Sequence, residues 1–183
     1  IPKVSSERRQ FIPIGYLDNE VICGDKIFFV DDASLFTFGV LTSTMHNAWM
    51  RQTCGRLESR YSYSNTIVYN NYPWPGFAGE PLSDKHRTAI EQAAQCVLDA
   101  RAQFAGSSLA DLYDPLTMPP VLLKAHQKLD TTVDAAYRPS GGKKTYATDA
   151  ERVAFLFDLY QRITSLLPAP AVKKTRRAKS TES

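Results

Sequence analysis

Residues 64–76, with the sequence SNTIVYNNYPWPG, divide this 183-residue chain into two parts of different character. The prolines Pro73 and Pro75 favour extended backbone at the residue before each of them, so a helix is not expected to pass through this stretch. Tyr69, Tyr72 and Trp74 supply the apolar bulk that anchors an irregular segment. We expect residues 64–76 to act as a structural clamp between a mixed first part and a helical second part.

The first part combines extended runs with one helix. Residues 8–17 suit an edge strand, which tolerates Pro13, and residues 21–30 supply a second extended run for a hairpin or small sheet. Alternation over residues 60–69 indicates a further extended segment. Asp31 and Asp32 offer an N-cap for a helix that ends near Gly55. Apolar residues recur at helical spacing along it: Leu35, Phe38, Leu41, Met45 and Trp49.

The second part reads as helical throughout. Ser83 or Asp84 can cap a helix over residues 85–104, and a short helical turn follows in residues 107–114, where capping and turn formation explain Asp111 and Asp114. A proline at 119 or 120 can start a helix that runs to about residue 137. A last helix opens at residues 148–151 and reaches about residue 167.

The fold class that follows is α+β. A small β-rich half with a packed helix occupies residues 1–77, and an all-α half of three helices occupies residues 78–168. Residues 169–183 form a basic tail whose composition predicts disorder. The chain has no initiator methionine, which suggests a piece of a longer polypeptide.

The composition excludes several classes of protein. The net charge is +3, but the tail after Val172 carries +4 of it, so the folded part is near −1 and any nucleic-acid surface must come from local placement of charge. There is no apolar run of about 18 residues and no signal peptide, so we expect a cytoplasmic protein without membrane contact. Three scattered cysteines predict reduced thiols and neither disulfides nor a zinc site.

Catalytic motifs are missing from the sequence. There is no glycine-rich phosphate loop, no Gly-x-Ser-x-Gly and no His-Glu-x-x-His. Residues 71–74 are superficially similar to the Asn/Asp-Pro-Pro-aromatic loop of amino-group DNA methyltransferases, but no Pro-Pro follows the asparagines. Each histidine stands alone on a predicted helix, which favours a surface or core-edge position. Four basic residues of the helical half read as solvated faces: Arg87, Lys124, Lys128 and Arg152.

A polar strip from Arg51 to Asn65 has the chemistry of a DNA contact. Arginine can bind guanine with two hydrogen bonds, asparagine can do so for adenine, and glutamate accepts from the cytosine amino group. On a strand, residues 58, 60, 62 and 64 would share one face and residues 59, 61 and 63 the other. The same residues also fit a solvated edge strand in which Glu58 pairs with Arg56 or Arg60.

Four blocks of the chain together resemble a known family. These blocks are SERRQFIPIGYL, FGVLTSTMHNAWMRQTCGRLESRYSYSNTIVYNNYPWP, LADLYDPLTMPPVLLKAHQKLDTTVDAAY and DAERVAFLFDLYQ. They are similar to the C-terminal part of MmeI-like DNA methyltransferases, which are single-chain bacterial restriction–modification enzymes of type IIG. The resemblance covers residues 5–160 and matches the target recognition domain followed by the C-terminal helical region.

The resemblance implies a DNA recognition module for a methyltransferase that modifies adenine N6. Double-stranded DNA and the methyltransferase domain of the same polypeptide would be its partners. S-adenosylmethionine would serve the parent enzyme, with Mg²⁺ for a nuclease region, and this chain alone would bind no cofactor and catalyse nothing. The expected base contacts are Arg56, Glu58, Arg60, Ser62 and Asn65. The expected backbone contacts are Lys26, Arg51, Tyr61 and Tyr63, and the two tyrosines are equally compatible with a place in the core.

Two other functions stay open from the sequence. A scaffold module that binds DNA without sequence preference would show affinity that falls with salt but does not distinguish duplexes. A protein-interaction domain that uses the helical half would not bind DNA at all.

Overall fold

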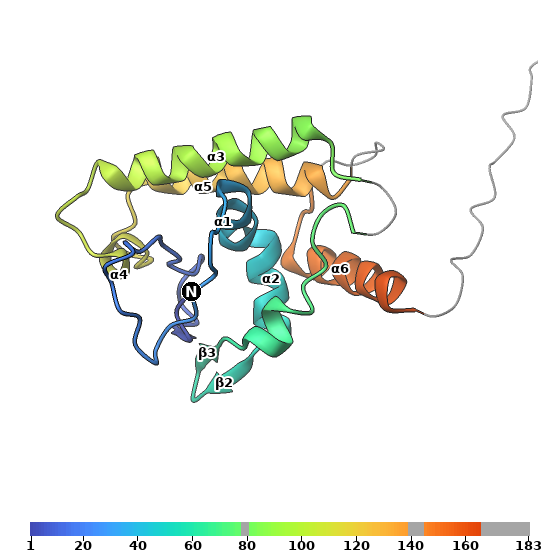
Figure 1. Ribbon diagram of the computed structural model, residues 1–183, viewed down its shortest axis with the longest axis horizontal. Coiled ribbons are helices and arrows are strands. Elements are labelled where there is room, and N and C mark those ends of the chain that lie inside the picture. The colour runs from blue at the N-terminus through green and yellow to red at the C-terminus, as the bar shows by residue number, and fades with distance from the viewer. Residues whose placement is uncertain (78–80, 139–144, 166–183) are drawn as a thin grey trace, which may run out of the picture.

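A computed structural model describes residues 1–77, 81–138 and 145–165. It confirms the α+β class: three short strands form one antiparallel sheet, and the helices surround a shared core (Figure 1). In chain order, the elements are β1 (Val4–Ser5), α1 (Leu35–Thr42), α2 (Thr44–Thr53), β2 (Gly55–Leu57), β3 (Arg60–Ser62), the π-helix η1 (Asn65–Tyr69), α3 (Asp84–Ala102), α4 (Leu109–Leu112), α5 (Pro120–Ala136) and α6 (Asp149–Thr164).

The helix predicted from residue 33 to residue 55 is in fact two helices. Ser43 adopts extended backbone, ends α1 by donating its N–H to the Val40 carbonyl, and caps α2 by accepting from the His46 N–H. Ser34, and not Asp31 or Asp32, caps α1. The apolar spacing continues across the break, so periodicity alone could not reveal it. The local signal is Ser43, because serine is a favoured N-cap for the helix that follows it.

The sheet has the order β1-β3-β2 and uses little of the sequence predicted for it. Val4 pairs with Ser62 in β1–β3, and Arg56 pairs with Tyr61 in β2–β3. The predicted strand over residues 8–17 is wrong: that segment is irregular and buries Phe11, Ile12 and Ile14 in the core. Residues 21–30 form only an isolated bridge between Ile27 and Pro2.

The extended prediction for residues 60–69 holds only for its first part. After β3, Ser64 caps η1 by accepting from the Ile67 N–H at 3.3 Å, and the Asn70 N–H closes the helix on the Asn65 carbonyl. Of the β-branched residues that suggested a strand here, Val68 is fully buried on the inner side of a π-helical turn, whereas Thr66 and Ile67 are exposed. Tertiary packing overrides strand propensity at this point.

The helical part follows its local signals closely. Ser83 caps α3, Pro120 is the first residue of α5, and Thr148 caps α6 by accepting from the Glu151 N–H, as predicted. Ser108 and Asp111 form a reciprocal capping box at α4, which confirms a capping role for that aspartate.

One hydrophobic core joins the two parts of the chain. In Figure 1, α3 lies along α5, while α1 and α2 stand below this pair and α6 packs against α2. Gly39 allows α1 to approach α3 closely: a Cβ there would lie 2.9 Å from a methyl carbon of Ile90 and 3.1 Å from the Ala94 methyl. The basic tail predicted to be disordered lies outside the described residues.

Candidate functional site

A short hairpin projects from the end of α2 and carries most of the predicted contact residues. β2 and β3 are joined by a turn at Glu58 and Ser59, and Glu58 has a positive φ of 57°. Every residue from Gly55 to Arg60 is exposed, and the hairpin points away from the helices at the lower edge of Figure 1. Because it projects, the hairpin can enter a groove of a binding partner, which a flat polar surface cannot do.

The two arginines of the hairpin lie on opposite faces. Arg56 is opposite Tyr61 in the register, and its guanidinium carbon lies 4.1 Å from the centre of the Tyr61 ring while Nη1 donates to the Ser59 carbonyl at 3.0 Å. Arg60 lies on the other face and its Nη2 pairs with Glu58 Oε2 at 2.7 Å. Glu58 belongs to the turn and not to a strand face as predicted. Both guanidinium groups are therefore held in place at an exposed tip.

The outgoing arm of the hairpin is fixed to α2 by buried hydrogen bonds. His46 Nδ1 lies 2.8 Å from the Leu41 carbonyl, which can only accept, so Nδ1 carries the proton and Nε2 accepts from the Tyr63 hydroxyl at 3.1 Å. Burial lowers the pKa of His46 to about 4, which keeps this tautomer neutral near pH 7. Trp49 Nε1 donates to the Val68 carbonyl at 3.0 Å. The hairpin, η1 and α2 thus form one unit.

The other predicted contact residues differ in their accessibility. Lys26 is exposed and pairs with the neighbouring Asp25, at 3.1 Å. Tyr63 is 6% exposed, and burial raises the pKa of its hydroxyl. Arg51 donates from Nη1 to Asp149 Oδ2 at 2.7 Å and from Nη2 to the Gln10 carbonyl. Of the base contacts proposed from sequence, Ser62 is half-buried in β3 and Asn65 is exposed at the start of η1.

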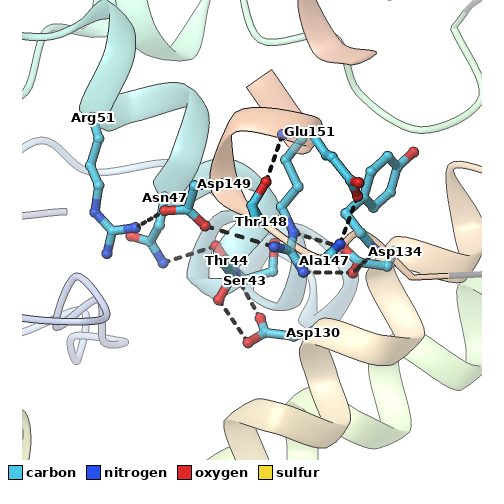
Figure 2. A network of polar contacts seen from close by, with 12 residues as sticks. Ser43, Thr44, Asn47, Arg51, Asp130, Asp134, Ala147, Thr148, Asp149 and Glu151 are labelled. Atoms are coloured by element: carbon cyan, nitrogen blue, oxygen red, sulfur yellow. Dashed lines mark hydrogen bonds and ion pairs between the residues drawn. The ribbon is translucent and has the colours of Figure 1, made fainter. Parts of the chain in front are cut away.

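Sequence reasoning missed the polar network that joins α2, α5 and α6, which Figure 2 shows. Arg152, predicted to be solvated, is buried and forms two hydrogen bonds to Asp134, at 2.7 and 3.2 Å. Asp130 accepts from the Thr44 N–H at 2.6 Å and from its hydroxyl at 2.7 Å. These partners are 18 and 86 residues apart, and no short motif signals such pairs.

Two of the three histidines, His46 and His126, differ from expectation because they are buried, whereas His86 is partly exposed as predicted. His126 is fully buried and its ring stacks on that of Phe11. Its Nε2 accepts a hydrogen bond from the Tyr113 hydroxyl at 2.7 Å, and Arg101 donates a hydrogen bond to the same hydroxyl oxygen. Burial and the Arg101 charge lower the pKa of His126 to about 3. No solvent-facing proton donor or acceptor results from this arrangement, so the group ties α3 to α5 and to the irregular segment before α1, where Ile14 accepts from Arg101.

The segment after η1 closes the contact between the two parts of the chain, as predicted. Tyr72 is 3% exposed, and the hydroxyl of Tyr137, the residue that follows α5, donates to the Tyr72 hydroxyl at 2.7 Å and lies 3.0 Å from the Pro73 carbonyl. The Tyr72 ring also meets His46 edge-on. Trp74 is only half-buried and packs on Tyr69 and Tyr72. Tyr72 is the main anchor of this clamp.

A groove of about 640 Å³ lies between the segment before α1 and α1 itself. Its lining is mainly apolar, and its polar side chains include Asp18, Asp31 and Asp32. Carboxylates at this rim would repel a phosphate backbone, so the hairpin is the better candidate for a nucleic-acid contact. Among residues 1–77, 81–138 and 145–165, no three His, Cys, Asp or Glu side chains gather as metal ligands, and no helix is long and apolar enough to cross a membrane.

Comparisons with known proteins cover almost the whole described chain. Residues 1–76 match the family described as MmeI, target recognition domain, and residues 82–168 match the family described as MmeI, C-terminal domain. The chain is 40% identical over 164 residues to DNA methyltransferase A of Bacillus subtilis (strain 168), which corresponds to 90% of this chain and 18% of that protein.

A solved relative shows the same fold. It is the type IIL restriction–modification enzyme MmeI, determined in complex with DNA, and it shares 51% identity with a TM-score of 0.81 over 91% of this chain. The match spans 21% of the MmeI chain. The chain therefore spans about a fifth of the length of each of these relatives.

Proposed function

Because the chain belongs to the family of MmeI target recognition and C-terminal domains, we propose that it is the DNA recognition module of a restriction–modification methyltransferase. The observation that carries the proposal is the 51% identity to an enzyme solved with DNA, over 91% of this chain and across both parts of it. The 40% identity to a DNA methyltransferase supports the same class. On this proposal the parent enzyme is a longer polypeptide that works on DNA in the cytoplasm, since the chain spans only 18% and 21% of the two relatives.

The hairpin has the shape and chemistry to read base edges. A two-stranded ribbon fits the major groove, where arginine recognises guanine and glutamate accepts from cytosine N4. Arg60 and Glu58 lie at the tip as a preformed pair, with side chains 45% and 78% exposed. A guanine–cytosine pair presents both complementary groups, so the two side chains can exchange their mutual hydrogen bond for contacts to one base pair.

The remaining exposed residues have supporting roles. Arg56 stacks on Tyr61 and donates from Nη1 to the Ser59 carbonyl, and its other guanidinium nitrogens can reach a second base or a phosphate. Ser62 lies on the Arg60 face of β3, Asn65 is exposed at the start of η1, and Lys26 supplies an exposed cation for the phosphate backbone. Tyr63, whose hydroxyl is used by His46, supports the hairpin from within.

The chemistry of methyl transfer belongs to the rest of the parent enzyme. Within the described residues, the strands lead into a turn, an irregular loop and η1, and none leads into the glycine-rich turn that cradles a dinucleotide-like cofactor. On this proposal, S-adenosylmethionine is bound outside this chain. We assign that cofactor, adenine-N6 specificity and any Mg²⁺-dependent cleavage to the other domains, and regard this chain alone as inactive.

The test is a binding experiment on the intact parent enzyme. The modified motif is first identified by sequencing methylated DNA, and a labelled duplex with that motif is then competed against scrambled duplexes at two salt concentrations. We expect strong preference for the motif, and a loss of about 1–3 kcal/mol of that preference in Arg60→Ala. Arg162→Ala, which removes an arginine of another exposed ion pair on α6, should leave the preference unchanged.

Two results would reject the proposal. Salt-dependent binding without preference among duplexes would identify a non-specific scaffold. Absence of an effect in Arg60→Ala, in a folded protein with wild-type preference, would show that the hairpin does not read the sequence.

A further inference from the structure

The unit formed by the hairpin, η1 and α2 is joined to the helical part through charges at both ends of α2. At the N-terminal end, Asp130 of α5 holds Thr44, the first residue of α2. At the C-terminal end, Arg51 pairs with Asp149, the first residue of α6, across 98 residues of sequence. Figure 2 shows both attachments. These polar contacts act together with the packing of Trp49 on Phe157 and Tyr160 of α6 to set the angle of α2 against α5 and α6.

The Arg51 attachment continues into the buried part of the network. Asp149 Oδ1 lies 3.7 Å from Arg152 Nη1, and Arg152 holds Asp134 of α5. The side chains of Arg152 and Asp134 are 11% and 2% exposed, so this inner pair is a fixed point. Arg51 also holds the Gln10 carbonyl of the irregular N-terminal segment. A chain of charges thus runs from the last turn of α2 to the interior of the helical part.

The position of the hairpin tip changes appreciably with a small tilt of α2. β2 begins two residues after α2 ends, and the tip at Glu58 lies five residues beyond Thr53. At about 3.3 Å per extended residue the arm measures roughly 16 Å, so a tilt of about 4° moves the tip by about 1 Å. Contact residues tolerate errors of only about 0.5 Å.

We propose that Arg51 and Asp149 are positioning residues, which hold the hairpin at the angle from which Glu58 and Arg60 read their base pair. This role rests on the proposed function and deepens it, because it makes the C-terminal helical part a determinant of sequence preference without a DNA contact of its own. Arg51 lies in the last turn of α2 and acts on the hairpin through that helix. Its guanidinium points toward Asp149 and Gln10 and not toward the solvent around the hairpin.

A direct phosphate contact by Arg51 makes different predictions. Loss of a phosphate contact weakens binding to all sequences alike and lowers the slope of log affinity against log salt concentration by about one. Removing the Asp149 charge would then release Arg51 for DNA and would strengthen binding. Under the positioning role, Asp149→Asn instead lowers discrimination between duplexes and leaves the salt dependence unchanged.

The experiment measures methylation by the intact parent enzyme. For each variant, kcat/KM is determined on the recognised duplex and on duplexes altered at single base pairs, and their ratio gives the discrimination. We expect Arg51→Met and Asp149→Asn each to lower the ratio at the base pair read by the hairpin by at least about fivefold. The double variant should be no worse than the worse single variant, because the two residues act as one unit.

Controls separate positioning from general stability. Asp158→Asn breaks an exposed ion pair elsewhere on α6 and should change neither the ratio nor the thermal midpoint appreciably. Arg51→Lys keeps a cation opposite Asp149 but cannot also hold Gln10 with a fixed fork, so it should recover part of the ratio lost in Arg51→Met.

The proposal is overturned if discrimination is unchanged in Asp149→Asn, if all duplexes lose rate equally, or if the two single effects multiply in the double variant. Arg60→Ala, measured alongside, identifies which idea has failed. If Arg60→Ala alters discrimination and Asp149→Asn does not, only the positioning role is wrong. If neither variant alters it, the hairpin does not read the sequence.

Discussion

Asp130 of α5, which contacts the first residue of α2, is expected to lower the free energy of unfolding at neutral pH. Its carboxylate accepts two hydrogen bonds from Thr44. Burial nevertheless raises the pKa of Asp130 from 3.8 to about 6, because lost hydration outweighs those hydrogen bonds and Asp134 adds repulsion. Replacement by asparagine keeps the shape, keeps an acceptor for the Thr44 N–H and removes the charge.

The size of the effect follows from the pKa difference. A shift of about two units at about 1.4 kcal/mol each amounts to about 3 kcal/mol. Since the folded-state pKa is the higher one, the stability from the protonated group is fully present below about pH 4 and is lost as the pH rises through 6. We therefore expect Asp130→Asn to raise the free energy of unfolding at pH 7 by up to about 3 kcal/mol, and to change it little at pH 4.

Urea unfolding of the 183-residue chain at pH 4, 5, 6 and 7 measures this difference. His46 and His126 titrate in the same range with the opposite sign, because burial lowers both pKa values below 6.5. Their contributions are common to both proteins and cancel in the comparison. A lower stability of Asp130→Asn at pH 7, or a difference that does not vary with pH, would refute the reasoning.

Two further predictions concern the contacts that join the parts of the chain. Arg152→Met should cost about 3–5 kcal/mol in urea unfolding, because it leaves the buried Asp134 carboxylate without its cationic partner, whereas Arg162→Met should cost less than about 1 kcal/mol. Trp74→Ala should cost about 2–3 kcal/mol in the same assay, since Trp74 packs on Tyr72 but is only half-buried. The variant should leave the sequence preference of the parent enzyme unaltered. A folded Trp74→Ala enzyme with altered preference would contradict the structural role of this segment.

The helical part could be predicted from sequence because its boundaries are local. A serine, a threonine and a proline mark the starts of α3, α6 and α5, and each acts on backbone groups within one turn. The first part could not be predicted in the same way. Phe11, Ile12 and Ile14 have strand-like composition, yet they fill the core from irregular backbone that is held by Asn47 and Arg101, residues far away in sequence.

The candidate site shows the same division. The exposed arginines and the glutamate of the hairpin are recognisable from residue chemistry, because their environment is solvent and a short turn. The role of Arg51 and the burial of Arg152 depend on partners 98 and 18 residues away. Periodicity places both on helices but cannot tell which helix lies opposite, so a buried ion pair and a solvated charge look alike in the sequence.

The most direct test of the central claim is the motif that the parent enzyme methylates in cells. Genomic DNA from cells that express the wild type, Glu58→Ala and Arg60→Ala would be sequenced with detection of modified bases. Reading by the hairpin predicts that both variants relax the motif at the same single base pair and preserve the rest. An unchanged motif in both variants, at wild-type levels of methylation, would contradict it.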